Sequence, residues 1–165
     1  MKTILLRSLL LAIVFVMNSC SPEEVEATPS AAAIVKDYTY NNTEVELAIA
    51  INEYRLSVGL NELQTVNHIS YKSREHNDYM ITNKVVNHDL FEERSQNIIE
   101  VLGAVKVNEN IAYNYTTSAG ALHAWLQSPG HKANIEGDFT HFGVSVTEDS
   151  VTGKKYYTNI FIKIN

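Results

Sequence analysis

The chain has 165 residues, with 13 basic and 19 acidic side chains and a net charge of −6. This acidic balance argues against nucleic acids and anionic membrane surfaces as partners. The single cysteine excludes an internal disulfide, so a folded domain must be stabilised by its core.

Residues 1–20 have the pattern of an export signal. Lys2 and Arg7 precede an apolar run from Leu9 to Met17, which is too short to cross a bilayer as a helix. The run ends in the sequence MNSC, which resembles a relaxed bacterial lipobox, whose cysteine is lipidated after cleavage. We therefore expect Cys20 to be the mature amino terminus and a lipid anchor. An ordinary cleaved signal or an uncleaved anchor is the alternative.

Residues 21–43 are expected to form a flexible tether, because the segment SPEEVEATPS is acidic, rich in proline and without periodicity. Acids this close to the cysteine resemble surface-export tags of some bacterial lipoproteins. We therefore expect anchoring outside the cytoplasm, at the outer membrane, with surface exposure as a further option. Residues 44–165 have the size of one domain, and a monomer is expected.

Helical periodicity dominates the first half of this domain. Thr43 and Glu46 have capping-box spacing, and apolar residues follow at helical intervals until Gly59. Asn67 is placed to cap a second helix, on which His68 is expected to face water. The residues that recur at helical intervals along this second helix are Ile69, Ser73, His76 and Met80.

The second half combines helices and strands. The segment after Asn83 is expected to be a loop that enters a short helix, and Ser118 begins a further helix. Pro129 and Gly130 are expected to end that helix and to leave His131 just past the turn. The sequences FGVSVTE and KYYTNIFIKI alternate like strands and flank residues 149–153, which predicts an antiparallel hairpin. The pattern indicates an α+β layered domain.

Three residues are candidates for chemistry: His88 in NHDLF, Glu109 in NENIA and His131 in WLQSPGH. They lie 21 and 22 residues apart, so only tertiary folding can bring them together. Two imidazoles and a carboxylate form a ligand set of exported zinc sites, and the same groups can act as general acid, general base and water-positioning group. No HExxH motif is present, so the spacing alone does not identify a metal site.

Each candidate also has a structural interpretation. His88 could be a turn residue between Asn87 and Asp89, and His131 could cap a helix end. A salt bridge to a lysine or to Arg94 would satisfy Glu109 equally well.

The remaining histidines are weaker candidates. His141 is expected either to support the site or to lie on an edge strand, and His76 and His123 are expected to be structural or exposed. Nucleophilic catalysis has little support, because the only cysteine is at the predicted mature terminus and no G-x-S-x-G motif occurs.

Several segments together resemble the CAP superfamily, also called the SCP domain, of cysteine-rich secretory, antigen 5 and pathogenesis-related proteins. The resemblance is to its cysteine-poor bacterial branch and covers residues 44–165. The matching segments, in family order, are AINEYRLSVGLNEL, NHDLFEER, NENIA, WLQSPGHKANI, FGVSV and YYTNIF.

The resemblance implies an α-β-α sandwich with a central antiparallel sheet and a large cleft. It places His88, Glu109 and His131 in that cleft, with Asn110 and His141 as supporting residues, and some members with this set bind zinc or another divalent ion. The sequence also departs from the family. No glutamate matches the second cleft acid expected after Trp125, and Asn108 replaces a glycine.

We therefore expect an exported lipoprotein of the cell envelope whose cleft binds a small ligand, a lipid, a peptide or a divalent ion. One alternative is a metal-assisted hydrolase in which Glu109 acts as base on a water held by His88 and His131. Another is a non-catalytic interaction module. The missing second acid and the missing nucleophile favour binding over turnover.

Overall fold

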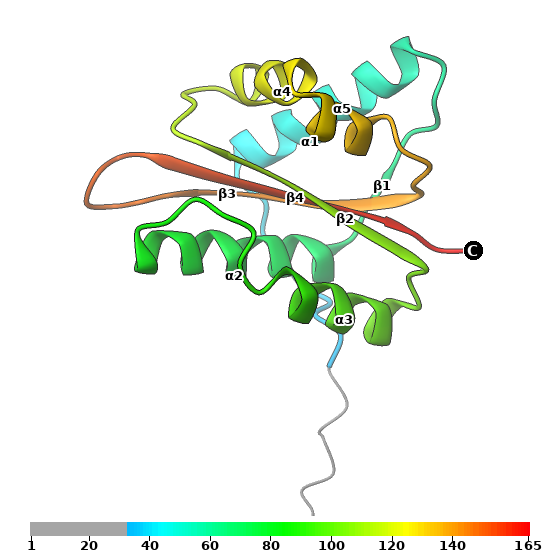
Figure 1. Cartoon of the computed structure of the whole chain (residues 1–165), viewed down its shortest axis with the longest axis horizontal. Helices are drawn as coiled ribbons and strands as arrows, with labels where there is room; N and C mark the ends of the chain where they lie inside the picture. Colours follow the sequence, from blue (N-terminus) through cyan, green and yellow to red (C-terminus); the bar gives the residue numbers. More distant parts are fainter. Residues whose placement is uncertain (1–32) are drawn as a thin grey trace, which may run out of the picture. The chain divides into compact units, whose positions relative to one another are not determined.

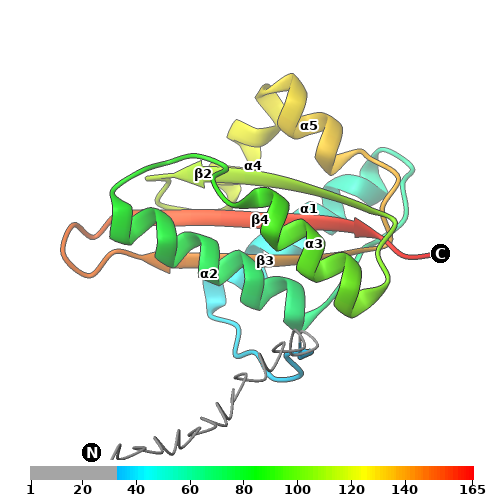
Figure 2. The ribbon, with the colours of Figure 1, turned by 60° about the horizontal axis from the view of Figure 1, so that its bottom comes forward.

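The computed structural model describes residues 33–165, which form a four-stranded sheet between two helical layers (Figure 1). One layer contains α1 (Asn42–Ser57), α4 (Ser118–Gln127) and α5 (Pro129–Ile135). The other contains α2 (Asn67–Asn83) and α3 (Phe91–Leu102), which lie across the opposite face of the sheet (Figure 2). The predicted α+β sandwich is confirmed.

The sheet has the strand order β1-β3-β4-β2. The strands are β1 (Gln64–Thr65), β2 (Lys106–Tyr113), β3 (His141–Glu148) and β4 (Lys155–Lys163). The predicted hairpin is β3 with β4, and β2 pairs antiparallel with the other side of β4. The two-residue β1 runs parallel to β3, so the sheet is antiparallel except at this short edge.

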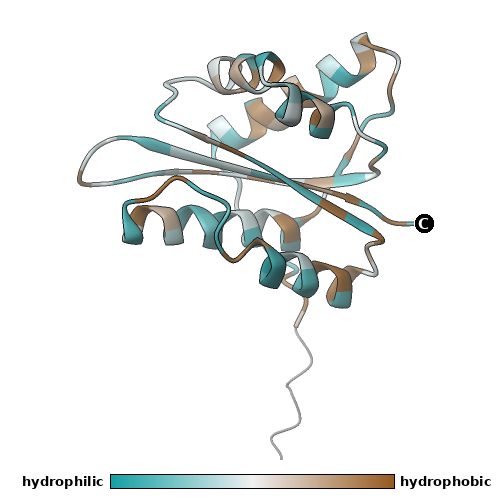
Figure 3. Ribbon diagram, viewed as in Figure 1, coloured by the Kyte–Doolittle hydropathy of each residue, from teal (hydrophilic) through white to brown (hydrophobic). Residues whose placement is uncertain are grey.

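Central strand β4 is buried along almost its whole length, because helices cover both faces of the sheet. On the face of α1, α4 and α5, Trp125 and Phe161 belong to the larger hydrophobic cluster. On the face of α2 and α3, Ile98 and Ile160 belong to the smaller one. Hydrophobic stretches accordingly lie along the strands between the two helical layers (Figure 3).

Gly143 on β3 permits the close approach of α2. A Cβ atom at this position would lie 2.3 Å from the backbone nitrogen of Ser70, at the start of α2. No side chain can occupy that space without moving the helix backbone. The glycine of the FGVSV segment therefore sets how closely the two layers pack.

Side chains cover backbone groups of both long outer strands. The Trp125 indole donates to the Ile111 carbonyl of β2 at 2.7 Å, and the Asn134 amide donates to the Glu109 carbonyl at 3.2 Å. On β3, Asn41 donates to the Val146 carbonyl at 3.0 Å. These contacts satisfy groups that would otherwise be open to another strand.

The helix boundaries correct three predictions. The capping box of α1 is formed by Asn41 and Glu44, with the same spacing as the predicted pair but two residues earlier. Asn67 is the first residue of α2 and does not cap it, because the N-cap is Val66. The helix from Ser118 ends before Pro129 as predicted, at Gln127, but Pro129 begins α5, so His131 lies within a helix and not just past a turn.

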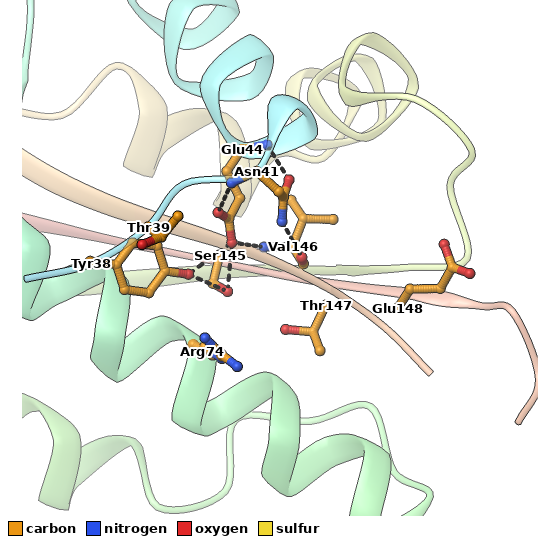
Figure 4. A pocket seen from close by; sticks show the side chains of 9 residues that line it. All are labelled: Tyr38, Thr39, Asn41, Glu44, Arg74, Ser145, Val146, Thr147 and Glu148. Atoms are coloured by element: carbon orange, nitrogen blue, oxygen red, sulfur yellow. Dashed lines mark hydrogen bonds between the residues drawn. The ribbon is translucent and has the colours of Figure 1, made fainter. Parts of the chain in front are cut away.

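Residues 33–41 form a strap that is bound to the domain, so the predicted tether of residues 21–43 is too long at its carboxyl end. The Tyr38 hydroxyl donates to the Glu44 carboxylate at 2.8 Å, and Ser145 and the Val146 amide donate to the same oxygen. Figure 4 shows this network below the start of α1. Tyr40 adds a bond to Asn67 on α2.

The strap also corrects the placement of His68. This imidazole is only 1% exposed. Its Nδ1 accepts the Val35 backbone amide at 3.1 Å, and its Nε2 lies 2.9 Å from Asn97 Oδ1 on α3. His68 therefore joins the strap, α2 and α3, and does not face water.

The predicted export signal, lipidated Cys20 and the first part of the tether lie outside the described residues. Within residues 33–165, no helix combines the length and the apolar character that crossing a membrane requires.

Candidate functional site

Glu109 is the buried centre of the candidate site. It lies in the middle of β2 with a side chain that is only 1% exposed. Arg94 of α3 binds its carboxylate through two nitrogens, Nε to Oε2 at 3.0 Å and Nη2 to Oε1 at 2.9 Å. The third guanidinium nitrogen, Nη1, donates to the Asp89 carbonyl at 2.7 Å. A two-point ion pair therefore satisfies the buried charge.

His88 is the exposed partner of Glu109. Its Nδ1 lies 2.8 Å from Glu109 Oε1, and its side chain is 48% exposed. Because a carboxylate only accepts hydrogen bonds, Nδ1 carries the proton and Nε2 of the neutral ring carries the free lone pair. The pair thus orients an imidazole whose second nitrogen is available to a ligand.

The loop that carries His88 is fixed at both ends by left-handed residues. Lys84 ends α2 with φ 56°, and Leu90 precedes α3 with φ 59°. Between them, the Asn87 carbonyl accepts from Nε2 of His76 at 2.8 Å, and Asp89 is held by Arg94. These contacts keep the His88 segment against α2 and α3.

His131 reaches the same region from α5. Its backbone carbonyl accepts from Asn110 at 3.0 Å, the residue after Glu109 on β2. Asn134, one turn further along α5, donates to Asn110 and to the Glu109 carbonyl. Burial lowers the pKa of His131, and the nearby charge on His88 lowers it further. No hydrogen bond joins the His131 ring to another residue of the part of the chain described.

Arg55 fixes the far end of α5. This buried guanidinium donates to the Ile135 and Gly137 carbonyls at 2.6 and 3.0 Å, and it also binds the backbone and side chain of Asn61. Burial lowers the pKa of Arg55. The sequence alone did not identify this residue, because its partners at and just past the end of α5 are backbone carbonyls about 80 residues away in the chain.

His76 is a site residue that sequence reasoning missed. Its buried Nε2 lies 3.8 Å from Glu109 Oε1, and its Nδ1 has no hydrogen-bond partner in the described chain. Burial lowers the pKa of His76, although the neighbouring charge of Glu109 acts in the opposite direction. The helical spacing of His76 with Ile69, Ser73 and Met80 was the signal in the sequence that could have indicated its burial.

Of the two predicted supporting residues, Asn110 lies at the site and His141 does not. Asn110 is fully buried and holds α5 through His131 and Asn134, so it supports the site. His141 lies at the start of β3, separated from β2 by β4, and its ring contacts Thr140 at 2.8 Å. The structure does not bring His141 to the site.

A divalent cation does not fit Glu109. Its carboxylate is shared between Arg94 and His88, so a bound cation would lie beside the guanidinium charge. Among residues 33–165, no three His, Cys, Asp or Glu side chains are grouped so that they could hold a metal ion. Of the predicted ligand set, only His88 and His131 remain as donors to a zinc ion. The same contacts argue against Glu109 as the general base of a hydrolase.

Comparisons with known proteins identify the family of this chain. The family model described as the cysteine-rich secretory protein family, CAP, matches residues 49–161. A 59-residue segment, 35% of this chain, is 48% identical to the uncharacterized membrane protein YlbC of Bacillus subtilis (strain 168). That segment spans only 15% of the Bacillus protein.

Two solved structures share the fold. An outer surface protein from Borrelia burgdorferi has a TM-score of 0.68 at 19% identity, over 79% of this chain and 100% of its own. An extracellular protein containing an SCP domain from Bacillus anthracis str. Ames has a TM-score of 0.66 at 27% identity, over 74% of this chain and 40% of its own. The chain belongs to the cysteine-rich secretory protein (CAP) family.

Proposed function

We propose that this chain is an extracytoplasmic binding protein of the cell envelope, whose site at His88, Glu109 and His131 receives a small ligand or a peptide. The observation that carries this proposal is the difference between the two partners of Glu109, the buried Arg94 and the exposed His88. The carboxylate is buried and saturated by Arg94, whereas the His88 ring that it orients is about half exposed. An acid in this arrangement positions an imidazole and does not itself react.

The two imidazoles define what the site offers. His88 presents Nε2, and burial favours the neutral form of His131. A neutral imidazole provides both a lone pair and an N–H group, so it suits a polar ligand that donates or accepts hydrogen bonds. The charges of Arg94 and Glu109 cancel each other, and therefore no net charge has to be compensated by the ligand.

The test is a binding screen that follows the imidazole signals by NMR. The full mature chain is mixed with a library of small polar compounds and short peptides, and the ring C–H resonances of His88 and His131 are recorded. A ligand of this site shifts both resonances, and His88→Ala weakens its binding. The matched control is His123→Ala, because His123 is exposed on α4. Ligands that bind the His88→Ala variant as tightly as the parent chain contradict the proposal.

The lipid anchor is part of the same proposal. Similarity to an outer surface protein and to an extracellular protein supports a location outside the cytoplasm, and the MNSC sequence supports lipidation at Cys20. Mass spectrometry of the mature amino terminus is expected to find acylated Cys20. A mature chain that begins beyond residue 20 without a lipid contradicts the anchor and leaves the site proposal unaffected.

A further inference from the structure

A pocket outside the imidazole site lies at the end of the sheet where α2 ends beside the β3–β4 hairpin. Its volume is about 490 Å³, within the range of small-molecule sites. Three separate parts of the chain line it: the end of α2, the strands β2 and β4, and the hairpin turn. The lining residues are Ile81, Lys84, Tyr113, Asp149, Val151, Thr152 and Tyr156.

Two tyrosines provide the aromatic surface of this pocket. Tyr113 on β2 and Tyr156 on β4 are directly opposite each other in the register, and their ring centroids are 4.7 Å apart. Tyr113 is four residues beyond Glu109 on the same strand, a distance of about 13 Å at 3.3 Å per residue. The pocket is therefore separate from the imidazole site.

The hairpin turn that lines one side of the pocket is held in one conformation by internal hydrogen bonds. Asp149 accepts from the Val151 amide at 2.9 Å and from the Thr152 hydroxyl at 2.5 Å, and its carbonyl accepts from Gly153 at 2.7 Å. The Thr152 and Val151 bonds lower the pKa of Asp149, so its side chain is a fixed anion. The same turn presents Val151 with a side chain that is 90% exposed.

Lys84 provides a positive charge on another wall. It is the left-handed C-cap of α2 and lines the same pocket as Asp149, and its charge contributes to the lowered pKa of that carboxyl. Yet no ion pair joins Lys84 to Asp149 among the salt bridges of residues 33–165. Opposite charges thus line one pocket together with the two tyrosines, and the charged groups form no ion pair with each other.

We infer that this pocket binds a small zwitterion of the amino-acid type with an apolar or aromatic body. The ligand's carboxylate pairs with Lys84 and its ammonium group with Asp149, while its body packs on Tyr113 and Tyr156. Charge complementarity supports this class over a simple anion or cation, because either of these would meet one like charge. Val151 covers the open side of the bound body.

The test uses L-phenylalanine as the probe, followed by 1H–15N NMR on the full chain. Phenylalanine is expected to shift the signals of Lys84, Tyr113 and Tyr156 in a saturable way. N-acetyl-L-phenylalanine lacks the ammonium charge and L-phenylalaninamide lacks the carboxylate, so each is expected to bind about tenfold more weakly, the equivalent of one lost ionic contact.

Two variants assign the charges. Lys84→Gln is expected to weaken the binding of phenylalanine and of the N-acetyl compound but to leave the binding of phenylalaninamide unchanged. Asp149→Asn is expected to weaken the binding of phenylalanine and of phenylalaninamide but to leave the binding of the N-acetyl compound unchanged. Lys132→Gln on α5 is the control for a lost surface charge. Asp149→Asn keeps an acceptor oxygen in the turn, and unchanged signals outside the hairpin establish that the variant is folded.

The inference is overturned if phenylalanine produces no saturable shifts at millimolar concentration. It is also overturned if both single-charge analogues bind as tightly as phenylalanine, since the charge pairing would then have no role. Shifts confined to His88 and His131 would place the probe at the other site and would equally contradict this assignment.

Discussion

The domain buries two glutamates, and they are satisfied in different ways. Glu44 receives its hydrogen bonds from neutral donors: the Tyr38 and Ser145 hydroxyls and the backbone amides of Val146 and Asn41. Glu109 is instead bound by the Arg94 guanidinium and by His88. Burial alone therefore does not mark a functional acid. What distinguishes Glu109 is that it holds a half-exposed titratable group.

The largest expected effect comes from removing Glu109. Glu109→Leu leaves the guanidinium of Arg94 buried without its partner, and we expect a loss of about 3–5 kcal/mol in the free energy of unfolding. Urea denaturation measures this loss. The double variant with Arg94→Met is expected to recover much of it, because both charges are then gone. A double variant no more stable than the single one contradicts the ion-pair account.

Removing the charge of Glu44 has a smaller expected effect. Glu44→Gln keeps the shape but places an amide among donors, and we expect a loss of about 1–3 kcal/mol. Hydrogen exchange is also expected to be faster in the strap, which Glu44 binds through Tyr38. Glu53→Gln, on the exposed side of α1, is the control. If both variants have the same stability as the parent chain, the network around Glu44 does not hold the strap.

The pH dependence of the free energy of unfolding tests whether His76, which lies beside Glu109, is buried in its neutral form. Burial lowers the pKa of His76 in the folded state, whereas the unfolded chain has the ordinary value of about 6.5. The unfolded state then binds more protons, so stability falls as the pH drops below about 6.5. Thermal melting between pH 7 and pH 5.5 measures this. His76→Phe is expected to make the melting temperature less dependent on pH. An equally steep dependence in that variant would mean that another group causes the loss of stability.

The smallest effect is expected at His88. Its ring is 48% exposed, so His88→Ala should change the free energy of unfolding by no more than about 1 kcal/mol. The pKa of His131 should rise in this variant, because the charge on His88 is one of the causes that lower it. An NMR titration of His131 measures the shift. An unchanged or lower pKa would mean that the two rings do not sense each other.

Local patterns predicted the elements better than their boundaries. The hairpin and the layered α+β class follow from periodicity, whereas the sandwich with helices on both faces was implied by the family resemblance, and all three are present. The capping box was misplaced, because the Thr43–Glu46 and Asn41–Glu44 pairs have identical spacing and only the tertiary contacts of Glu44 with β3 select the latter. Pro129 follows the end of α4 as predicted, but the start of α5 was missed, since proline fits both the end of one helix and the first turn of the next.

The sequence named part of the candidate site but not its contacts. Family motifs identified His88 and Glu109, and the structure joins them at 2.8 Å. Arg94 was one of two ways to satisfy Glu109, and the sequence could not choose between them. His68 was misplaced because Val35, which binds it, belongs to the strap. His76 is structural, as one of the two expectations had it, but its position beside Glu109 depends on the pairing of β2 in the sheet and could not be read from its helix.

The central claim is that Glu109 orients the exposed ring of His88. The most direct measurement is the tautomer of neutral His88 in the parent chain, from long-range 1H–15N correlations of the imidazole at pH 8. The account predicts that Nδ1 carries the proton, because that nitrogen faces the carboxylate. A neutral His88 with its proton on Nε2 would contradict it.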